Sequence, residues 1–194
     1  MPKINILDKK IYNRIAAGEV VERPYSVVKE LVENALDAKA DDIEIVIEDG
    51  GKKLIRVSDN GCGISADDLT KAFLPHATSK IATVEDLDHI LTLGFRGEAL
   101  ASIGAVSKAS IVTKTSDEEM GNMIVCEGGA IGDVDVYPSE TGTTVIVENL
   151  FYNTPARAKF LKASKSEETD ITNIITRLIL SHPNVAFKYT SNGK

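Results

Sequence analysis

The clearest periodic segment of the chain lies between residues 24 and 38. Its apolar side chains recur every three or four residues and form one broad face of a helix, made of Val27, Val28, Leu31, Val32, Ala35 and Leu36. A second stripe of the same period carries only acids and an amide, namely Glu30, Glu33, Asn34 and Asp37. Pro24 suits a first helical turn, so the pattern predicts that the helix starts there. The polar stripe is either a solvated face or a functional one, and the helix alone does not decide between them.

Alternating apolar and polar positions elsewhere predict strands that are joined mostly by tight turns. A β-hairpin is expected from strands at about 43–47 and 53–58 around the turn Asp49-Gly50-Gly51. Further strands are predicted at 108–115, 122–127, 143–148 and 185–190, and helices at 8–17, about 83–91, 97–103 and 167–181. Helices that precede and interrupt hairpin-joined strands indicate an α+β fold, with helices on one face of a mostly antiparallel sheet.

Length and composition narrow the class of protein. The 194 residues suffice for one domain with a proper core, and 43% hydrophobic with 26% charged residues is ordinary for a soluble globular protein. No apolar run has the length of a membrane span, and the first residues lack the layout of a signal peptide. Cys62 and Cys126 give neither a metal-binding spacing nor a disulfide framework, which favours a reduced, cytoplasmic setting. A net charge of −7 argues against binding nucleic acid through the overall field.

The last residues read as an interrupted hairpin. Ser191-Asn192-Gly193 is typical of a tight turn and follows the predicted strand 185–190. The sequence stops at Lys194, where a returning strand is expected. We therefore expect the 194 residues to be a fragment of a longer protein, cut inside a hairpin.

The segment DNGCGI, residues 59–64, is a candidate ligand site. Its two glycines, Gly61 and Gly63, have no Cβ and allow a close approach of backbone to a ligand. Asp59 shares the parity of Ile55 and Val57, so its carboxylate is expected to point toward the apolar face, where it needs a hydrogen-bonding partner. An acceptor-only group there suits an exocyclic amine such as that of adenine. The alternative is an ordinary turn aspartate followed by loop glycines.

Two later segments carry groups that suit phosphate. Thr78, Ser79 and Lys80 supply two hydroxyls and a cation within HATSKI. The turn Gly94-Phe95-Arg96-Gly97 leads into a predicted helix whose free N–H groups suit an anion, although such a turn is also common without function. No Walker A motif occurs in the chain. Thr143 opens a strand with a hydroxyl, which by itself is more typical of strand propensity than of function.

The order of these segments resembles the GHKL ATPases, which include gyrase subunits, heat-shock chaperones, histidine kinases and the MutL mismatch-repair proteins. Within that superfamily the resemblance narrows to the MutL family. The segments that carry it are IAAGEVVERPYSVVKELVENALDA (15–38), DNGCGI (59–64), HATSKI (76–81), LGFRGEALASI (93–103) and FYNTPARAKFLK (151–162). The resemblance implies the two-layer GHKL sandwich of helices on one face of a mixed, mostly antiparallel sheet.

The resemblance also implies a role for each candidate residue in an ATP site. Glu30 would be the general base for the attacking water and Asn34 the Mg²⁺ ligand, with Glu33 and Asp37 supporting or solvated. Asp59 would bind the adenine amine, with Thr143 supporting that contact through water. The other implied nucleotide contacts are Gly61, Gly63, Thr78, Ser79, Lys80, Gly94, Phe95, Arg96, Gly97, Ala99 and Leu100. Arg96 has the alternative of an ion pair inside the lid.

Partners and domain organisation follow from the same resemblance. Residues 1–194 would form one ATP-binding domain, with a dimerisation arm at 1–20 and an ATP lid at about 75–104. ATP binding would pair two copies of the chain, which would then work with a mismatch-recognition MutS-type protein. A lysine from a following domain would complete the site, so this chain alone would hydrolyse ATP weakly or not at all.

Two other functions stay open at this point. A phosphotransfer kinase of the same fold would need a phospho-accepting histidine on a partner helix bundle, and the sequence shows none. A DNA-binding module without catalysis would use the basic run ARAKFLKASK, in which Arg157, Lys159, Lys162 and Lys165 occur without an acid. Such a short run is either a solvated face or a minor DNA contact.

Overall fold

A computed structural model of the chain describes residues 17–18, 20–80, 92–94 and 97–194. Seven strands form one sheet in the order β5-β4-β3-β6-β2-β1-β7. They are β1 (Asp42–Glu48), β2 (Leu54–Asp59), β3 (Lys108–Lys114), β4 (Gly121–Glu127), β5 (Ala130–Tyr137), β6 (Gly142–Glu148) and β7 (Ala186–Ser191). All neighbouring pairs are antiparallel except β1 and β7, which are parallel. The predicted mixed, mostly antiparallel sheet is therefore confirmed.

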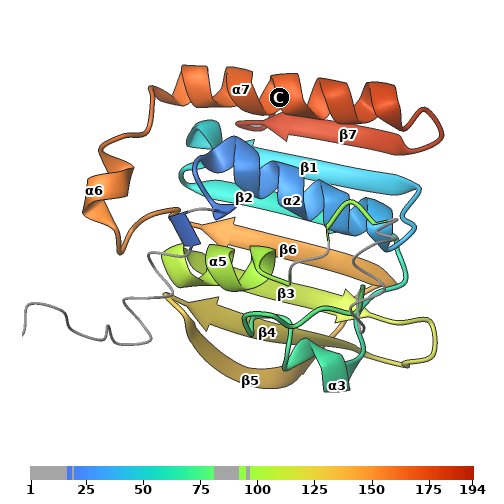
Figure 1. Cartoon of the computed structure of the whole chain (residues 1–194). Coiled ribbons are helices and arrows are strands. Elements are labelled where there is room, and N and C mark those ends of the chain that lie inside the picture. The colour runs from blue at the N-terminus through green and yellow to red at the C-terminus, as the bar shows by residue number, and fades with distance from the viewer. Residues whose placement is uncertain (1–16, 19, 81–91, 95–96) are drawn as a thin grey trace, which may run out of the picture.

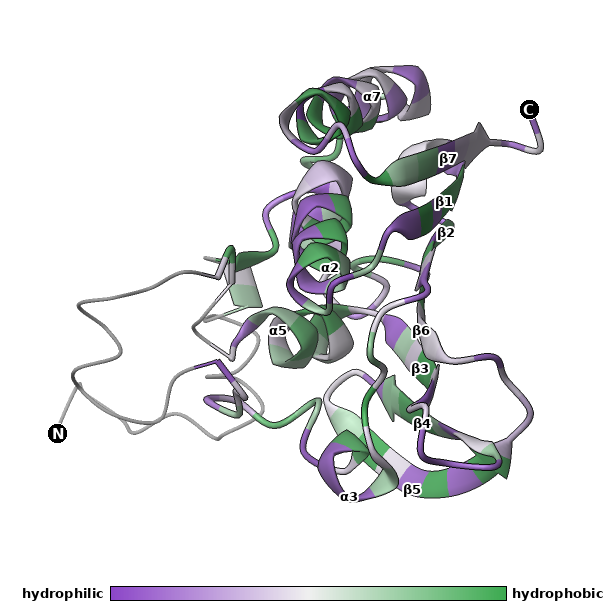
Figure 2. Ribbon diagram, turned by 90° about the vertical axis from the view of Figure 1, so that its right-hand side faces the viewer, coloured by the Kyte–Doolittle hydropathy of each residue, from purple (hydrophilic) through white to green (hydrophobic). Residues whose placement is uncertain are grey.

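The larger helices lie on one face of this sheet (Figures 1 and 2). They are α2 (Pro24–Asp37), α5 (Ala99–Val106) and α7 (Ser164–Ser181), and the shorter ones are α3 (Ala66–Leu69), α6 (Pro155–Ala158) and the 3₁₀ turn η1 (Asp49–Gly51). Figure 2 shows the opposite face of the sheet without a covering helix. The two-layer α+β arrangement agrees with the fold class expected from the sequence. Among the described helices, none is long and apolar enough to cross a membrane.

The core lies between the sheet and the helices. The apolar stripe of α2 is buried as predicted, with Val27, Val28 and Val32 fully inaccessible. It faces the inward side chains of the first hairpin, whose register pairs Ile45 with Val57 and Ile43 with Asp59. Because side chains directly opposite each other in an antiparallel pair share a face, this register puts Asp59 on the helix-covered face, as its parity predicted.

The end of the chain forms the predicted turn. Asn192 and Gly193 both have positive φ, at 49° and 77°, as a two-residue hairpin turn requires. Ser191 and Lys194 exchange two backbone hydrogen bonds of 2.9 and 3.0 Å across it. The turn thus reverses the chain after β7.

Some boundaries differ from the sequence predictions. The last helix begins three residues earlier than expected, at Ser164, and the helix expected at 97–103 spans 99–106. β5 and the short helices α3 and α6 were not predicted. Most of the expected helix 8–17 and of the arm 1–20, and all of the expected helix 83–91, lie outside the described residues.

Candidate functional site

The polar stripe of α2 is only partly solvated. The side chains of Glu33 and Asp37 are 12% and 10% exposed, and that of Glu30 is 28% exposed. Lys29 Nζ lies 2.8 Å from Glu33 Oε2 and 3.4 Å from Glu30 Oε1. Lys29 therefore forms an ion pair with Glu33, four residues later on the same helix. Glu33 therefore takes part in a local ion pair, and Glu30 is the more accessible of the two carboxylates.

Asp37 holds two segments that are distant in sequence against the end of α2. Its Oδ2 lies 2.5 Å from Lys80 Nζ and accepts a hydrogen bond of 3.1 Å from the Gly94 N–H, and its Oδ1 accepts one of 3.0 Å from the Leu93 N–H. Burial alone would raise the pKa of this carboxyl, but the bonds from Lys80, Leu93 and Gly94 outweigh it and lower the pKa. Asp37 is therefore a supporting residue that connects both ends of the predicted lid, rather than a solvated one.

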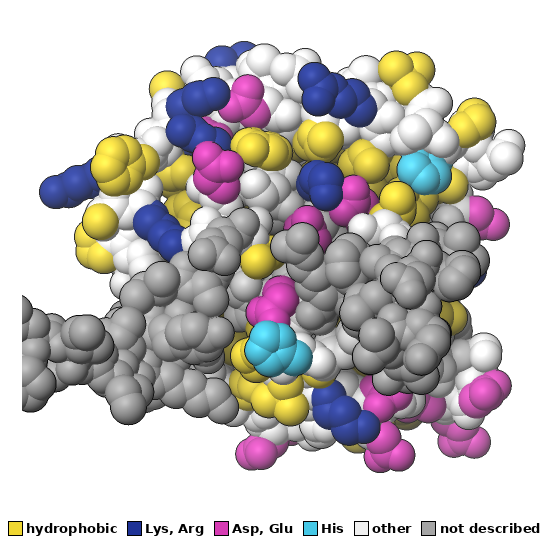
Figure 3. Space-filling view, in the orientation of Figure 1, with side chains coloured by type: hydrophobic (Ala, Val, Ile, Leu, Met, Phe, Trp, Pro, Cys, Tyr) yellow, Lys and Arg dark blue, Asp and Glu magenta, His cyan; other side chains and the backbone are white. Residues whose placement is uncertain are grey.

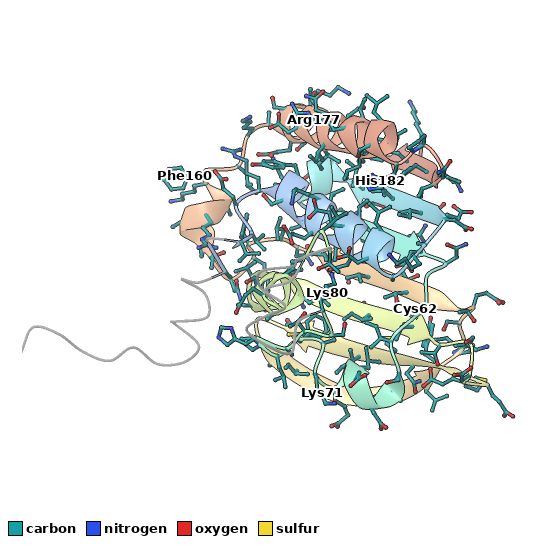
Figure 4. All side chains as sticks on the ribbon, turned by 45° about the vertical axis from the view of Figure 1, so that its right-hand side comes forward. Cys62, Lys71, Lys80, Phe160, Arg177 and His182 are labelled. Atoms are coloured by element: carbon teal, nitrogen blue, oxygen red, sulfur yellow. The ribbon has the colours of Figure 1, made fainter. Side chains whose placement is uncertain are left out.

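Lys80 also contacts the predicted metal ligand. Its Nζ donates to Asn34 Oδ1 over 2.9 Å, and the ammonium thus bridges Asn34 and Asp37 one helical turn apart. Figure 4 shows Lys80 near the α2 end of the site. Gly94 lies against the same group, since a Cβ there would come within 3.2 Å of Lys80 Nζ. The structure thus brings together Asn34, Lys80 and Gly94, as the site prediction requires.

Asp59 ends β2 with one oxygen used and one available. Its Oδ1 accepts hydrogen bonds from the N–H of Gly61 at 2.9 Å and of Thr143 at 3.3 Å. Within the described residues no hydrogen bond reaches its Oδ2. Burial raises the pKa of this carboxyl, against the opposing effect of the two backbone N–H donors. A half-buried acceptor with a free oxygen is what recognition of an amine needs.

The loop after Asp59 packs against the end of α2, which joins the two halves of the site. The Cys62 N–H donates to the carbonyl of Ala38 over 3.0 Å. A Cβ on Gly61 would lie 2.8 Å from Ala38, and Gly63, with φ of 74°, abuts the Lys114 carbonyl. Contacts within the chain itself therefore require these glycines. From the sequence they were explained only by the close approach of a ligand.

The remaining predicted contacts surround the same region. Thr78 Oγ1 accepts a hydrogen bond of 3.2 Å from the Lys80 N–H, Ser79 lies between these two residues, and Ala99 and Leu100 form the first turn of α5. The N–H of His76 donates to Gly97 O over 3.1 Å, and His76 Nδ1 lies 2.5 Å from Glu98 Oε1, so both ends of the expected lid are joined. Phe95 and Arg96 lie outside the described residues.

The described part of the chain holds no cluster of three or more His, Cys, Asp or Glu side chains that would bind a metal. Asn34 Oδ1, the predicted metal ligand, would therefore act without a cluster of carboxylates beside it. One or two protein oxygens, completed by phosphates and water, are the usual protein contribution to a Mg²⁺ site. This donor set fits Mg²⁺ held together with a nucleotide and does not fit a self-sufficient metal site.

Two of the four cations in the basic run 156–165 pair with acids. Lys162 Nζ lies 2.8 Å from Asp170 and Lys165 Nζ 3.3 Å from Glu168, both on α7. The Arg157 guanidinium lies against Gly18 and 5.9 Å from the centre of the Phe151 ring. Figure 3 shows basic side chains beside acidic ones along this side of the molecule. These contacts favour structural roles for Arg157 and Lys162 over the predicted contacts with DNA, and leave Lys159 exposed.

His182 lies at the C-terminal end of α7. It follows the last residue of α7, and its Nδ1 lies 3.0 Å from the Leu178 carbonyl and 2.9 Å from Ser181 Oγ (Figure 4). The side chain therefore caps its own helix. Nothing in this placement favours a phosphotransfer role.

Sequence comparison places these features in a family. The profile of the family described as histidine kinase-, DNA gyrase B- and HSP90-like ATPase matches residues 22–136. Over all its 194 residues the chain is 54% identical to the DNA mismatch repair protein MutL of Clostridium tetani (strain Massachusetts / E88). It is 55% identical to MutL of Clostridium botulinum (strain Eklund 17B / Type B). The chain covers 31% and 29% of these proteins, so it spans about a third of the length of the curated relatives it matches.

Comparison of folds gives a concordant result. The Aquifex aeolicus MutL ATPase domain complexed with ADP matches with a TM-score of 0.71 and 37% identity, over 90% of this chain and 62% of that one. A structure described as the N-terminal domain of a DNA repair protein matches with a TM-score of 0.77 and 34% identity, over 94% and 53%. The chain therefore belongs to the histidine kinase-, DNA gyrase B- and HSP90-like ATPase family, and its relatives by sequence and by fold are MutL-type ATPase domains.

Proposed function

We propose that the chain binds ATP with Mg²⁺ and hydrolyses it as the switch domain of a MutL-type DNA mismatch repair protein. The observation that carries the proposal is that the loop after Asp59 packs on Ala38, next to the end of α2 where Asn34, Asp37, Lys80 and Gly94 form a cluster. One group of contacts suits a base with an amine, and the other suits phosphates and a cation. Membership of the ATPase family supports the same assignment.

In this proposal each residue has a separate task. Glu30, on the exposed edge of the α2 stripe, orients the attacking water and accepts its proton. Backbone N–H groups of Gly97, Ala99 and Leu100 donate to phosphate oxygens, where charge develops during phosphoryl transfer. The Gly94 N–H joins them once it leaves Asp37. Phe95, Arg96, Thr78 and Ser79 complete the lid, and Gly61 and Gly63 shape the loop beside the nucleoside. When bound, Mg²⁺ supplies positive charge to the phosphates, and Asn34 is the side chain that would hold it.

The wider assembly is also part of the proposal. Two copies of the chain pair when ATP is bound, through residues 1–20 and the lid at about 75–104, and the dimer acts with a MutS-type mismatch-recognition protein. A lysine from a following domain completes the site, and the setting is cytoplasmic. DNA contact by this segment is minor, with Lys159 the candidate that its surroundings leave exposed.

Nucleotide binding tests this function directly. Asp59→Asn replaces a charged acceptor by an amide, so the affinity for Mg-ADP should fall by about 1.5–3 kcal/mol, the value of a hydrogen bond to a charged group. Isothermal titration calorimetry on the wild type and the variant measures the loss. Saturating Mg-ADP at about 100 times Kd should also stabilise the wild type by about 2.7 kcal/mol. A wild type that shows neither heat nor thermal shift, or that binds GDP as tightly as ADP, would contradict the proposal.

The raised pKa of Asp59 adds a pH dependence to the same titration. The amine contact needs the ionised carboxylate, so affinity should be full above the raised pKa and fall as pH drops through it. The nucleotide phosphates titrate as well, but they do so equally with both proteins. The wild-type minus Asp59→Asn difference in affinity should therefore shrink as pH falls, and a difference independent of pH would exclude this carboxylate as the titrating contact.

Lys80 gives a second prediction, because its ammonium contacts the oxygen that the metal would use. Lys80→Met removes a cation that lies 2.9 Å from Asn34 Oδ1, so a divalent ion should bind the ADP-saturated chain more tightly, roughly fivefold for about 1 kcal/mol of lost repulsion. Mn²⁺ titrations followed by electron paramagnetic resonance measure this affinity. Lys71→Met is the matched control, since Lys71 pairs with Asp68 on α3 (Figure 4). Equal Mn²⁺ affinity in both variants would show that Lys80 does not compete with the metal.

A further inference from the structure

Three residues on neighbouring strands form a polar row across the buried face of the sheet. The register pairs Asp59 of β2 with Thr143 of β6, and Thr143 with Thr113 of β3. Side chains opposite each other in antiparallel pairs share a face, so all three point toward the helices. Thr113 is completely buried. Thr113 was not among the site residues expected from the sequence. In the sheet, Thr143 lies between Asp59 and Thr113.

The hydroxyl of Thr113 has all its hydrogen-bonding capacity in use. A hydroxyl offers one proton and two lone pairs. The Ile64 N–H donates to Thr113 Oγ1 over 2.9 Å, which takes one lone pair. The Gly142 carbonyl lies 2.9 Å away and can only accept, so it receives the single proton of Thr113. The remaining neighbour, Thr143 Oγ1 at 3.0 Å, must therefore donate its own proton to the second lone pair of Thr113.

This order of protons fixes what Thr143 presents to a ligand. Its only hydroxyl proton points to Thr113. The Thr143 oxygen can therefore only accept a hydrogen bond on the side of Asp59. Asp59 likewise presents an acceptor, Oδ2, because its Oδ1 is held by two backbone N–H groups. The end of the β2–β6 pair is therefore lined by hydrogen-bond acceptors alone among these three side chains.

We propose that Thr113 is a positioning residue that sets base selectivity: it holds the proton of Thr143 away from the nucleotide, so that the side chains of Asp59 and Thr143 present only acceptors to the base. The inference rests on the proposed nucleotide binding and deepens it. Adenine presents an amino group at its six position, whereas guanine presents a carbonyl oxygen there. Asp59 and Thr143 then donate no hydrogen bond to that oxygen. They therefore reject guanine more strongly than they would if the Thr143 hydroxyl were free to rotate.

Thr113→Val tests this by removing the hydroxyl at nearly constant shape. Thr143 then becomes free to donate toward the base, so GDP should gain relative to ADP. The ratio of Kd for GDP to Kd for ADP should fall by about tenfold, the worth of one hydrogen bond of ordinary strength. Thr113→Ser keeps the hydroxyl and should restore the wild-type ratio. Competition calorimetry with ADP and GDP measures both constants for each protein.

The test uses the ratio of the two Kd values because this ratio would stay unchanged if Thr113 had only a structural role. Thr113→Val also removes one hydrogen bond from the Ile64 N–H and one from the Gly142 carbonyl, so both affinities should fall together if only packing is lost. An unchanged ratio in Thr113→Val overturns the inference while leaving nucleotide binding intact. If no nucleotide binds the wild type, the proposed function itself fails, and the two failures are thus distinguishable.

Two further measurements keep the test decisive if Thr113→Val does not fold. Thr113→Cys has a similar size with a much weaker donor and acceptor, and its ratio should also fall. In the wild type, purine riboside diphosphate lacks any group at the six position, and inosine diphosphate carries an oxygen there. Inosine diphosphate should bind more weakly than purine riboside diphosphate, because its oxygen at the six position would face the acceptor oxygens of Asp59 and Thr143. Equal or tighter binding of inosine diphosphate would show that a donor is available, and would refute the proton order.

Discussion

Glu30→Ala is expected to slow ATP hydrolysis by about 10²–10⁴, the usual contribution of a general base, with nucleotide affinity close to that of the wild type. Glu30 is the more exposed carboxylate of the α2 stripe, and its only described partner is Lys29, at 3.4 Å. Removing it leaves Asn34, Asp59 and the lid contacts unchanged. Because the proposal assigns binding to those groups and proton transfer to Glu30, the effects on rate and on affinity should separate.

Asn34→Ala provides the contrast on the same helical face. It removes the proposed metal ligand, so Mg-ATP affinity itself should fall while the base remains in place. Single-turnover hydrolysis of radiolabelled ATP with protein in excess detects even slow chemistry, and calorimetry gives the affinity separately. Glu33→Gln is the matched control, since Glu33 is engaged by Lys29 at 2.8 Å and should keep its rate. If Glu30→Ala loses binding but keeps its rate per bound nucleotide, the base lies elsewhere, with Glu33 the first candidate.

The parts of the fold that sequence predicted are those that local periodicity determines. The apolar stripe of α2 and the alternation of β1 and β2 each bury one face, so their patterns directly record the structure. β5 escaped prediction because it is an edge strand with seven exposed residues out of eight, and carries Asp133 and Asp135. Charges of this kind protect an edge from pairing with other chains, and they also erase the alternating pattern.

The candidate site divides in the same way. Asp59 was correctly placed on the inner face because its own strand fixes its parity. Asp37 was left undecided because its partners, Lys80 and Gly94, are 43 and 57 residues away in sequence. Thr113 reaches the site only through the register of β3 on β6. No local pattern encodes that register, although a threonine at an inward position of a strand is a signal to look for a buried partner.

An ion pair between Arg23 and Glu167 connects α7 with the start of α2, the proposed catalytic helix. Glu167 has no exposed surface, and its Oε1 receives Arg23 Nη1 at 2.8 Å and the Lys162 N–H at 2.7 Å. Arg23 directly precedes Pro24, the first residue of α2. No local sequence pattern indicates this pair, because its members are 144 residues apart.

Arg23→Met should lower the free energy of unfolding by about 3–5 kcal/mol, because it leaves a buried carboxylate without its compensating charge. Arg23→Met with Glu167→Met should recover most of the loss, since replacing both members of a buried pair by apolar side chains is often neutral. Urea denaturation measures each change through the midpoint at constant slope. Lys53→Met is the control, because its pair with Glu48 is largely exposed and its removal should change the midpoint little. A single variant no less stable than this control, or a double variant less stable than Arg23→Met alone, would show that Arg23 does not compensate the charge of Glu167.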